Sequence, residues 1–154
     1  VMIDHFTKYA EAAPYQEITA SETARLIFAT WIARHGVPMA IQSDNGPAFA
    51  AELQLEFVAL VGSIKIFSNP GHPQTNGLVE RQNEIVIGIL RSTGIKNRGE
   101  WVLHLPHAIG AYNSMRHATT LVTPNLLMMG KERRYTVSLL FPSDQLHKTR
   151  SLYV

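Results

Sequence analysis

Apolar side chains recur at helical spacing in several parts of the chain, and turn-forming residues separate these parts. The first helix begins after Thr19-Ala-Ser-Glu22, a capping box in which Thr19 and Glu22 can satisfy each other's backbone, and continues to about His35. Gly36 and Pro38 then end it, since neither continues a helix easily. The same periodicity predicts helices at about 50–61, 78–92, 101–114 and 124–129.

Short apolar runs between these helices predict strands. Val1–Ile3 and Tyr9–Tyr15 are expected to form a hairpin, and two further strands are expected at Met39–Ser43 and Ile64–Phe67. Strands and helices alternate through the centre of the chain, which indicates an α/β fold with some parallel pairing. Ligands of such sheets gather outside the carboxyl ends of strands, and Asp44 stands at one of these ends.

Composition excludes several classes of protein. A chain of 154 residues, 45% apolar and 17% charged, suits one globular domain. The absence of cysteine rules out disulfides and cysteine-based zinc sites. No apolar run is long enough to span a membrane, and the first residues do not resemble a signal peptide.

Charge is distributed unevenly along the chain. Residues 1–77 carry four basic and seven acidic side chains, a net charge of −3, whereas residues 78–154 carry ten basic and five acidic ones, a net charge of +5. A basic second half is compatible with a polyanionic partner, although it is also compatible with an ordinary solvated surface.

Two carboxylates stand at positions suited to chemistry. Asp44 follows a predicted strand and opens a tight Asp-Asn-Gly turn, so one interpretation is that it only caps this turn. Glu80 lies near the start of the predicted helix over 78–92, where the helix dipole favours an acid.

The apolar stripe of that helix supports a second interpretation of Glu80. At about 100° per residue, Glu80 lies away from the centre of the stripe, which comprises Leu78, Val79, Ile85, Val86, Ile89 and Leu90. Such a carboxylate can face a cleft while the opposite side of its helix packs on the sheet. Together with an acid at a strand end, it could hold Mg²⁺, which prefers oxygen ligands and serves phosphodiester chemistry.

The order and spacing of these motifs resemble a known family. Q-S-D-N-G, then 35 residues between Asp44 and Glu80, and H-P-Q-T-N-G-L-V-E-R-Q-N together resemble the catalytic core of retroviral and Ty3/gypsy-type retrotransposon integrases. D-H-F-T-K-Y-A-E-A-A-P and the segment 111–134 extend the resemblance on both sides. It implies an RNase H-like α/β fold, a mixed central sheet flanked by helices.

The resemblance also assigns residues. It implies that Asp44 and Glu80 are catalytic carboxylates that bind Mg²⁺ or Mn²⁺. It further implies that four polar side chains approach DNA: Gln74, Asn76, Arg81 and Asn83.

One family feature has no counterpart at the expected place. The family's first catalytic aspartate lies on the strand before the segment that here contains Asp4, so Asp4 does not match it. We therefore expect a core at 1–142 that lacks this first strand, an unassigned tail at 143–154, and little or no activity of the chain alone.

The function implied by the resemblance is DNA integration, through 3′-end processing and strand transfer by a homo-oligomer that binds element ends and target DNA. The family works in the nucleus. One alternative is a catalytically inactive or host-adopted module that binds DNA or protein. Another is an RNase H-like nuclease, but the Q-S-D-N-G and H-P-Q-T-N-G motifs favour the integrase branch.

Overall fold

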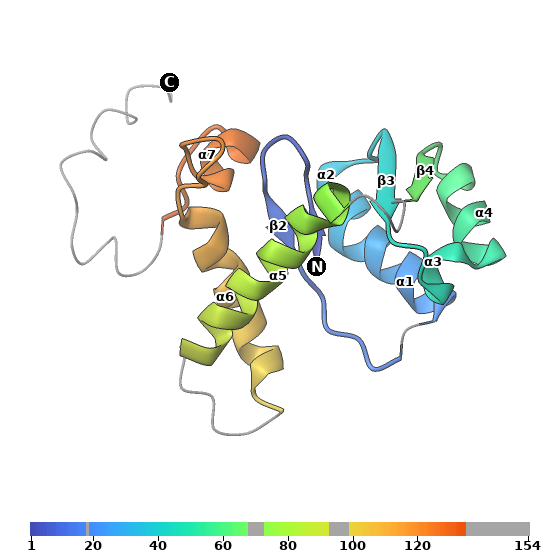
Figure 1. Ribbon diagram of the computed structural model, residues 1–154, viewed down its shortest axis with the longest axis horizontal. Coiled ribbons are helices and arrows are strands. Elements are labelled where there is room, and N and C mark those ends of the chain that lie inside the picture. Colours follow the sequence, from blue (N-terminus) through green and yellow to red (C-terminus); the bar gives the residue numbers. More distant parts are fainter. Residues whose placement is uncertain (18, 68–72, 93–98, 135–154) are drawn as a thin grey trace.

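The computed structural model describes residues 1–17, 19–67, 73–92 and 99–134 (Figure 1). Its elements, in chain order, are β1 (Met2–Ile3), β2 (Ala10–Glu11), α1 (Ala20–Ile27), the π-helical turn η1 (Phe28–Ile32), α2 (Ala33–His35), β3 (Ala40–Ser43), α3 (Pro47–Ala50), α4 (Glu52–Leu60), β4 (Ile64–Phe67), α5 (Pro73–Ser92), α6 (Trp101–Ser114) and α7 (Pro124–Met129).

The predicted N-terminal hairpin is confirmed, with shorter strands than expected. β1 and β2 pair antiparallel, with Met2 opposite Glu11 and Ile3 opposite Ala10. The turn is closed by the Asp4 carboxylate, which accepts hydrogen bonds from both the backbone N–H and the hydroxyl of Thr7 at 2.7 Å.

The first predicted helix is confirmed from Ala20 to His35, and it contains a π-helical turn that periodicity did not predict. The Thr19 hydroxyl accepts the Glu22 N–H at 3.2 Å, which is one half of the predicted capping box. The Glu22 carboxylate pairs with Arg25 at 2.6 Å. Gly36 ends the helix with a φ of 84°, in the region that favours glycine.

The second sheet consists of β3 and β4, which pair in parallel with Ala40 opposite Ile64 and Ser43 opposite Phe67. The predicted helix at about 50–61 is confirmed as α4, and a short helix that the sequence did not predict, α3, precedes it, separated from it by the extended backbone of Ala51. α3 begins at Pro47, whose missing N–H costs nothing in the first turn.

The predicted start of the long helix at Leu78 is wrong, since α5 begins at Pro73. Gln74 and Asn76 therefore lie in the first turns of α5 and not in a loop, and their side chains are not among those that the structure describes. Proline fits the first position of a helix, which explains how P-Q-T-N-G can be helical in spite of its turn-forming composition.

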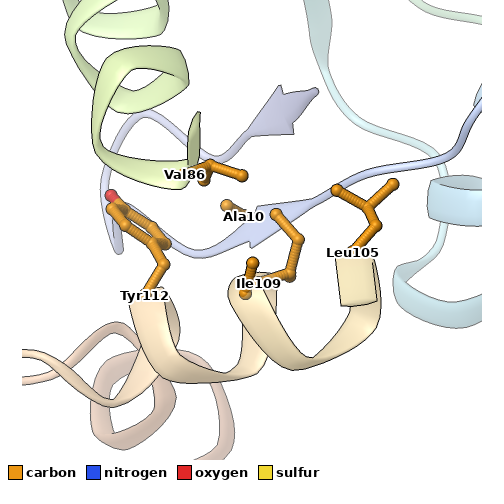
Figure 2. Close-up of a cluster of buried hydrophobic side chains, with 6 residues drawn as sticks. Ala10, Val86, Leu105, Ile109 and Tyr112 are labelled. Atoms are coloured by element: carbon orange, nitrogen blue, oxygen red, sulfur yellow. The ribbon is translucent and has the colours of Figure 1, made fainter. Parts of the chain in front are cut away.

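A buried apolar cluster joins β2, α5 and α6. Its members are Ala10, Val86, Leu105, Ala108, Ile109 and Tyr112 (Figure 2). Two side chains of α6 fasten β2 to this cluster. The Asn113 amide donates to the carbonyl of Ala10 at 2.8 Å and accepts its N–H at 2.9 Å, while the Tyr112 hydroxyl donates to the carbonyl of Lys8 at 3.1 Å.

The fold is mixed α/β, as predicted, although its described strands form two separate two-stranded sheets. β1 and β2 lie with α5 and α6 on one side of the molecule, and β3 and β4 lie with α1, α3 and α4 on the other (Figure 1). Among the described helices, none is both long and apolar enough to cross a membrane.

Candidate metal and nucleic-acid site

Asp44 lies directly after β3, where the chain turns into α3, and its side chain is exposed. Its Oδ1 accepts the Gly46 N–H at 3.1 Å, so the turn-capping interpretation is correct for this oxygen. A Cβ on residue 46 would stand 3.1 Å from that Oδ1, so only glycine leaves the carboxylate undisturbed. The turn therefore helps to fix the position of the Asp44 carboxylate.

A half-buried cation, the Lys65 ammonium, lies beside this turn. The Lys65 ammonium on β4 donates to the Ser43 hydroxyl at 2.7 Å, and Ser43 in turn donates to the carbonyl of Asp44 at 2.7 Å. The same ammonium lies over the rings of Phe49 and Phe67, at 5.2 and 5.3 Å from their centroids. Burial lowers the pKa of Lys65, and the charge of Asp44 partly opposes that effect.

Glu80 is the eighth residue of α5 and is exposed, while another face of the same helix is covered. Gln82 and Val86 are buried and Ile89 packs against the apolar cluster. Ile85, which the sequence placed on the apolar stripe, is exposed, so the buried stripe is narrower than predicted. The stripe fixes the rotation of α5 and keeps Glu80 in solvent.

The two carboxylates are oxygen donors, which suits a hard divalent cation such as Mg²⁺. In residues 1–17, 19–67, 73–92 and 99–134, no group of three or more His, Cys, Asp or Glu side chains could hold a metal ion. Asp44 and Glu80 therefore supply donors of the right chemistry, and two such donors do not complete a metal site by themselves.

The side chains on α5 that were predicted to contact DNA differ in exposure. Arg81 is exposed and Asn83 is half-buried, one residue and three residues after Glu80. Gln74 and Asn76 precede Glu80 on the same helix. The four residues predicted to contact DNA thus lie on the same helix as Glu80. Side-chain positions on this part of α5 are described for Glu80, Arg81 and Asn83.

Asp4 is committed to its turn, as two hydrogen bonds from Thr7 show. This role of Asp4 in the turn is structural. His104 and His107 lie on α6, and among the described residues neither belongs to a metal-binding group. His72 lies outside the described residues.

Sequence reasoning missed a polar contact beneath the site. Gln82 is 1% exposed, and its Nε2 lies 3.2 Å from Nε2 of His117, in the loop between α6 and α7. The Nδ1 of His117 accepts the Thr119 N–H at 3.2 Å. The position of Gln82 in the sequence could have indicated its burial, because Gln82 precedes the buried Val86 by one helical turn and so lies on the covered face of α5.

Comparison with known proteins finds relatives among retrotransposon polyproteins. The chain is 34% identical over 125 residues to the Transposon Tf2-3 and Tf2-7 polyproteins of Schizosaccharomyces pombe, an alignment that covers 80% of this chain and 9% of the polyprotein. The chain thus spans less than a tenth of the length of these curated relatives. No family model matches it.

Solved structures that share this fold include integrase catalytic cores. The HTLV-2 integrase catalytic core domain in complex with magnesium aligns with a TM-score of 0.68 and 22% identity, covering 82% of this chain and 80% of that one. The BIV integrase catalytic core domain aligns with a TM-score of 0.68 and 25% identity, covering 83% and 82%. These cores have an RNase H-like fold. The chain is thus a relative of the Tf2 retrotransposon polyproteins, with the fold of a retroviral-type integrase catalytic core.

Proposed function

We propose that this chain is the catalytic core of a Ty3/gypsy-type integrase, and that residues 1–142 form that core. One observation carries the proposal: Asp44 lies at the carboxyl end of β3 and Glu80 on the exposed side of α5, with 35 residues between them, in a fold shared with integrase cores. The substrates would be element ends and target DNA.

In this proposal Asp44 and Glu80 hold Mg²⁺ or Mn²⁺. The bound metal would activate water or a DNA 3′-hydroxyl and stabilise the leaving oxygen. The protein's own contribution is placement. The Gly46 N–H fixes one oxygen of Asp44, and the buried stripe of α5 fixes the direction of Glu80. Arg81 and Asn83 would contact the DNA, together with Gln74 and Asn76.

Self-association is part of the proposal. The HTLV-2 core occurs in trimeric and dimeric forms, and the simian T-cell lymphotropic virus integrase occurs in an intasome. We expect this chain to form homo-oligomers when it binds paired DNA ends.

Mn²⁺ binding measured by calorimetry tests the carboxylate pair. Asp44→Asn and Glu80→Gln are each expected to weaken binding by at least about tenfold, because each removes a charged oxygen ligand. Glu84→Gln and Glu52→Gln are matched controls, since both remove an exposed acid from a helix without touching the proposed ligands. Binding that is unchanged in Asp44→Asn and Glu80→Gln would refute the pair.

A second candidate function is DNA binding without catalysis. The feature that favours it is the basic second half of the chain, residues 78–154, whose net charge of +5 suits contact with the phosphates of DNA. A strand-transfer assay with Mn²⁺ separates the two functions. The chain alone is expected to bind DNA and to join it poorly, and robust joining that survives Asp44→Asn would exclude the proposed role of Asp44.

A further inference from the structure

A cavity of about 690 Å³ lies where the hairpin, α2, α6 and the segment after α7 meet. Neither Asp44 nor any α5 side chain that the structure describes lines it, so it is separate from the proposed metal site. We propose that this cavity binds a short acidic peptide, whose carboxylates contact basic side chains while an apolar side chain covers the apolar lining. The inference goes beyond the proposed function and does not depend on it.

Part of the cavity lining is apolar. Tyr9 and Ile109 belong to the buried core, and the other members of this lining are Ala12, Pro106 and Met129. The volume falls within the range of about 300–1,000 Å³ that is usual for ligand pockets. The cavity therefore has room for an apolar side chain together with a stretch of peptide backbone.

The charged part of the lining is predominantly basic. Four basic and two acidic side chains line the cavity, a net charge of +2; they are Arg34, Lys131, Arg133 and Arg134, and Glu11 and Glu132. A positive cavity attracts an anionic partner and disfavours a cationic one.

Both acids of the lining already have partners within the protein. The Glu11 carboxylate pairs with Arg34 at 3.2 Å and with His35 at 3.3 Å. The Glu132 carboxylate accepts the Thr123 hydroxyl, with its two oxygens at 2.8 and 2.9 Å. Glu11 and Glu132 are thus engaged within the protein.

Two of the basic side chains are available to a ligand. Lys131 and Arg134 are exposed, and within the ranges that the structure describes neither forms an ion pair with an acid. A carboxylate entering the cavity would therefore find positive charge that the protein's own acids do not neutralise.

The basic segment at 131–134 is held in place before any ligand binds. Gly130 ends α7 with a φ of 69°, the left-handed conformation that favours glycine, and its N–H donates to the carbonyl of Leu126 at 2.9 Å. The contact between Glu132 and Thr123 then fixes the segment against the start of α7. Binding to a segment that is already placed costs less conformational entropy.

An acidic peptide fits these features better than other occupants. Residues 135–154 of the chain itself contain one acid, Asp144, and two bases, Lys148 and Arg150, so their net charge of +1 has the wrong sign for a positive cavity. A DNA duplex supplies phosphates, but it has no apolar side chain to cover Ile109 and Met129. A peptide that alternates acidic and apolar residues supplies both.

Peptide binding measured by fluorescence anisotropy tests the site. The probe is a fluorescein-labelled octapeptide of alternating glutamate and leucine, and the protein is the full chain. Lys131→Gln and Arg134→Gln are each expected to weaken binding about two- to fivefold, as expected for the loss of one exposed ion pair. Met129→Gln is expected to weaken binding several-fold through the apolar lining, and Met129 is exposed enough that the fold should be unaffected.

Matched controls separate the site from general charge attraction. Arg25→Gln removes the same unit of charge from α1, outside the cavity lining, and should leave the affinity unchanged. A peptide with glutamine in place of glutamate, and one with alanine in place of leucine, should both bind at least about fivefold more weakly. Loss of binding with the first peptide but not with the second would indicate charge attraction alone and overturn the proposal.

Other results would also overturn it. Equal affinities in Lys131→Gln, Arg134→Gln and Arg25→Gln would show that the peptide binds elsewhere. Displacement of the peptide by a DNA duplex at matched ionic strength would assign the surface to nucleic acid. Sedimentation showing that the peptide dissociates a dimer would assign the cavity to an interface between copies of the chain.

The test is independent of the metal site. Mn²⁺ binding should be the same in Lys131→Gln and Arg134→Gln as in the unaltered chain, because neither residue is a proposed ligand. Failure of the peptide site would therefore leave the proposed function standing, and weak Mn²⁺ binding would leave the peptide site standing.

Discussion

The two sides of the molecule are packed very differently. The side formed by β2, α5 and α6 has a contiguous buried apolar cluster, and the buried amide of Asn113 matches both backbone groups of Ala10. The side formed by α1, α3, α4, β3 and β4 leaves many large apolar side chains exposed, among them Met39, Leu53, Leu60, Ile64 and Ile66. It also buries Gln54, whose amide atoms have no hydrogen-bond partner among the described residues.

The difference bears on the two proposed ligands, because each side supplies one. Glu80 belongs to α5, which is held by the apolar cluster, and Asp44 belongs to a turn on the thinly packed side. A metal site built this way would have one fixed ligand and one ligand on a less stable support. Regions with fewer buried apolar contacts open locally at lower free energy.

The two sides meet at the end of α2. The Glu11 carboxylate on β2 pairs with Arg34 at 3.2 Å and with His35 at 3.3 Å, and the His35 ring packs edge-on against Tyr9 with 5.5 Å between centroids. This contact ties α2 to the hairpin, so the orientation of the two sides depends partly on polar groups.

The largest expected effect is on the well-packed side. Asn113→Ala leaves the N–H and carbonyl of Ala10 buried without these partners, which is expected to destabilise the fold by about 2–5 kcal/mol. Urea unfolding measures the change. Asn83→Ala is the matched control, since Asn83 is half-buried on α5 and its loss should cost less than about 0.5 kcal/mol. Equal losses in the two variants would contradict the anchoring role.

A pair of valines compares the two sides directly. Val86 is 3% exposed and Val58 is 1% exposed, so the same apolar area is lost when either becomes alanine. Val86→Ala is expected to cost about 1.5–3 kcal/mol, and Val58→Ala about half as much, because looser surroundings can collapse into the cavity. Thermal unfolding of both variants measures the difference. A larger loss for Val58→Ala would show that burial, and not the packing of neighbours, decides the cost.

A pair of buried glutamines gives the smallest effects. Gln54→Met removes an amide without described partners and is expected to stabilise the protein by about 1–2 kcal/mol. Gln82→Met also removes the contact to His117, so its effect should be near zero or unfavourable. The denaturant midpoint should therefore rise in Gln54→Met and stay unchanged or fall in Gln82→Met. A destabilised Gln54→Met would indicate that a partner exists for that amide.

Much of the local structure was predictable because it depends on neighbouring residues. Gly36 ends the first helix, Ile64–Phe67 forms a strand and Pro124–Met129 forms a helix, all as predicted. The start of α5 was predicted wrongly because turn-forming residues were read as a loop, whereas proline at the first helical position permits a helix. The pair of candidate carboxylates, Asp44 and Glu80, was likewise identified from the spacing of the motifs in the sequence.

The sequence by itself determined the α/β class, the family resemblance and the two candidate carboxylates, since periodicity, turn chemistry and motif spacing are local or one-dimensional. Only the tertiary structure decided which polar groups are buried and what they contact. Asn113 holds Ala10 across 103 positions of sequence, and Gln82 meets His117 across 35. Pairings of this kind depend on how helices and strands pack, and no pattern along the chain encodes the distance between two side chains that meet only after folding.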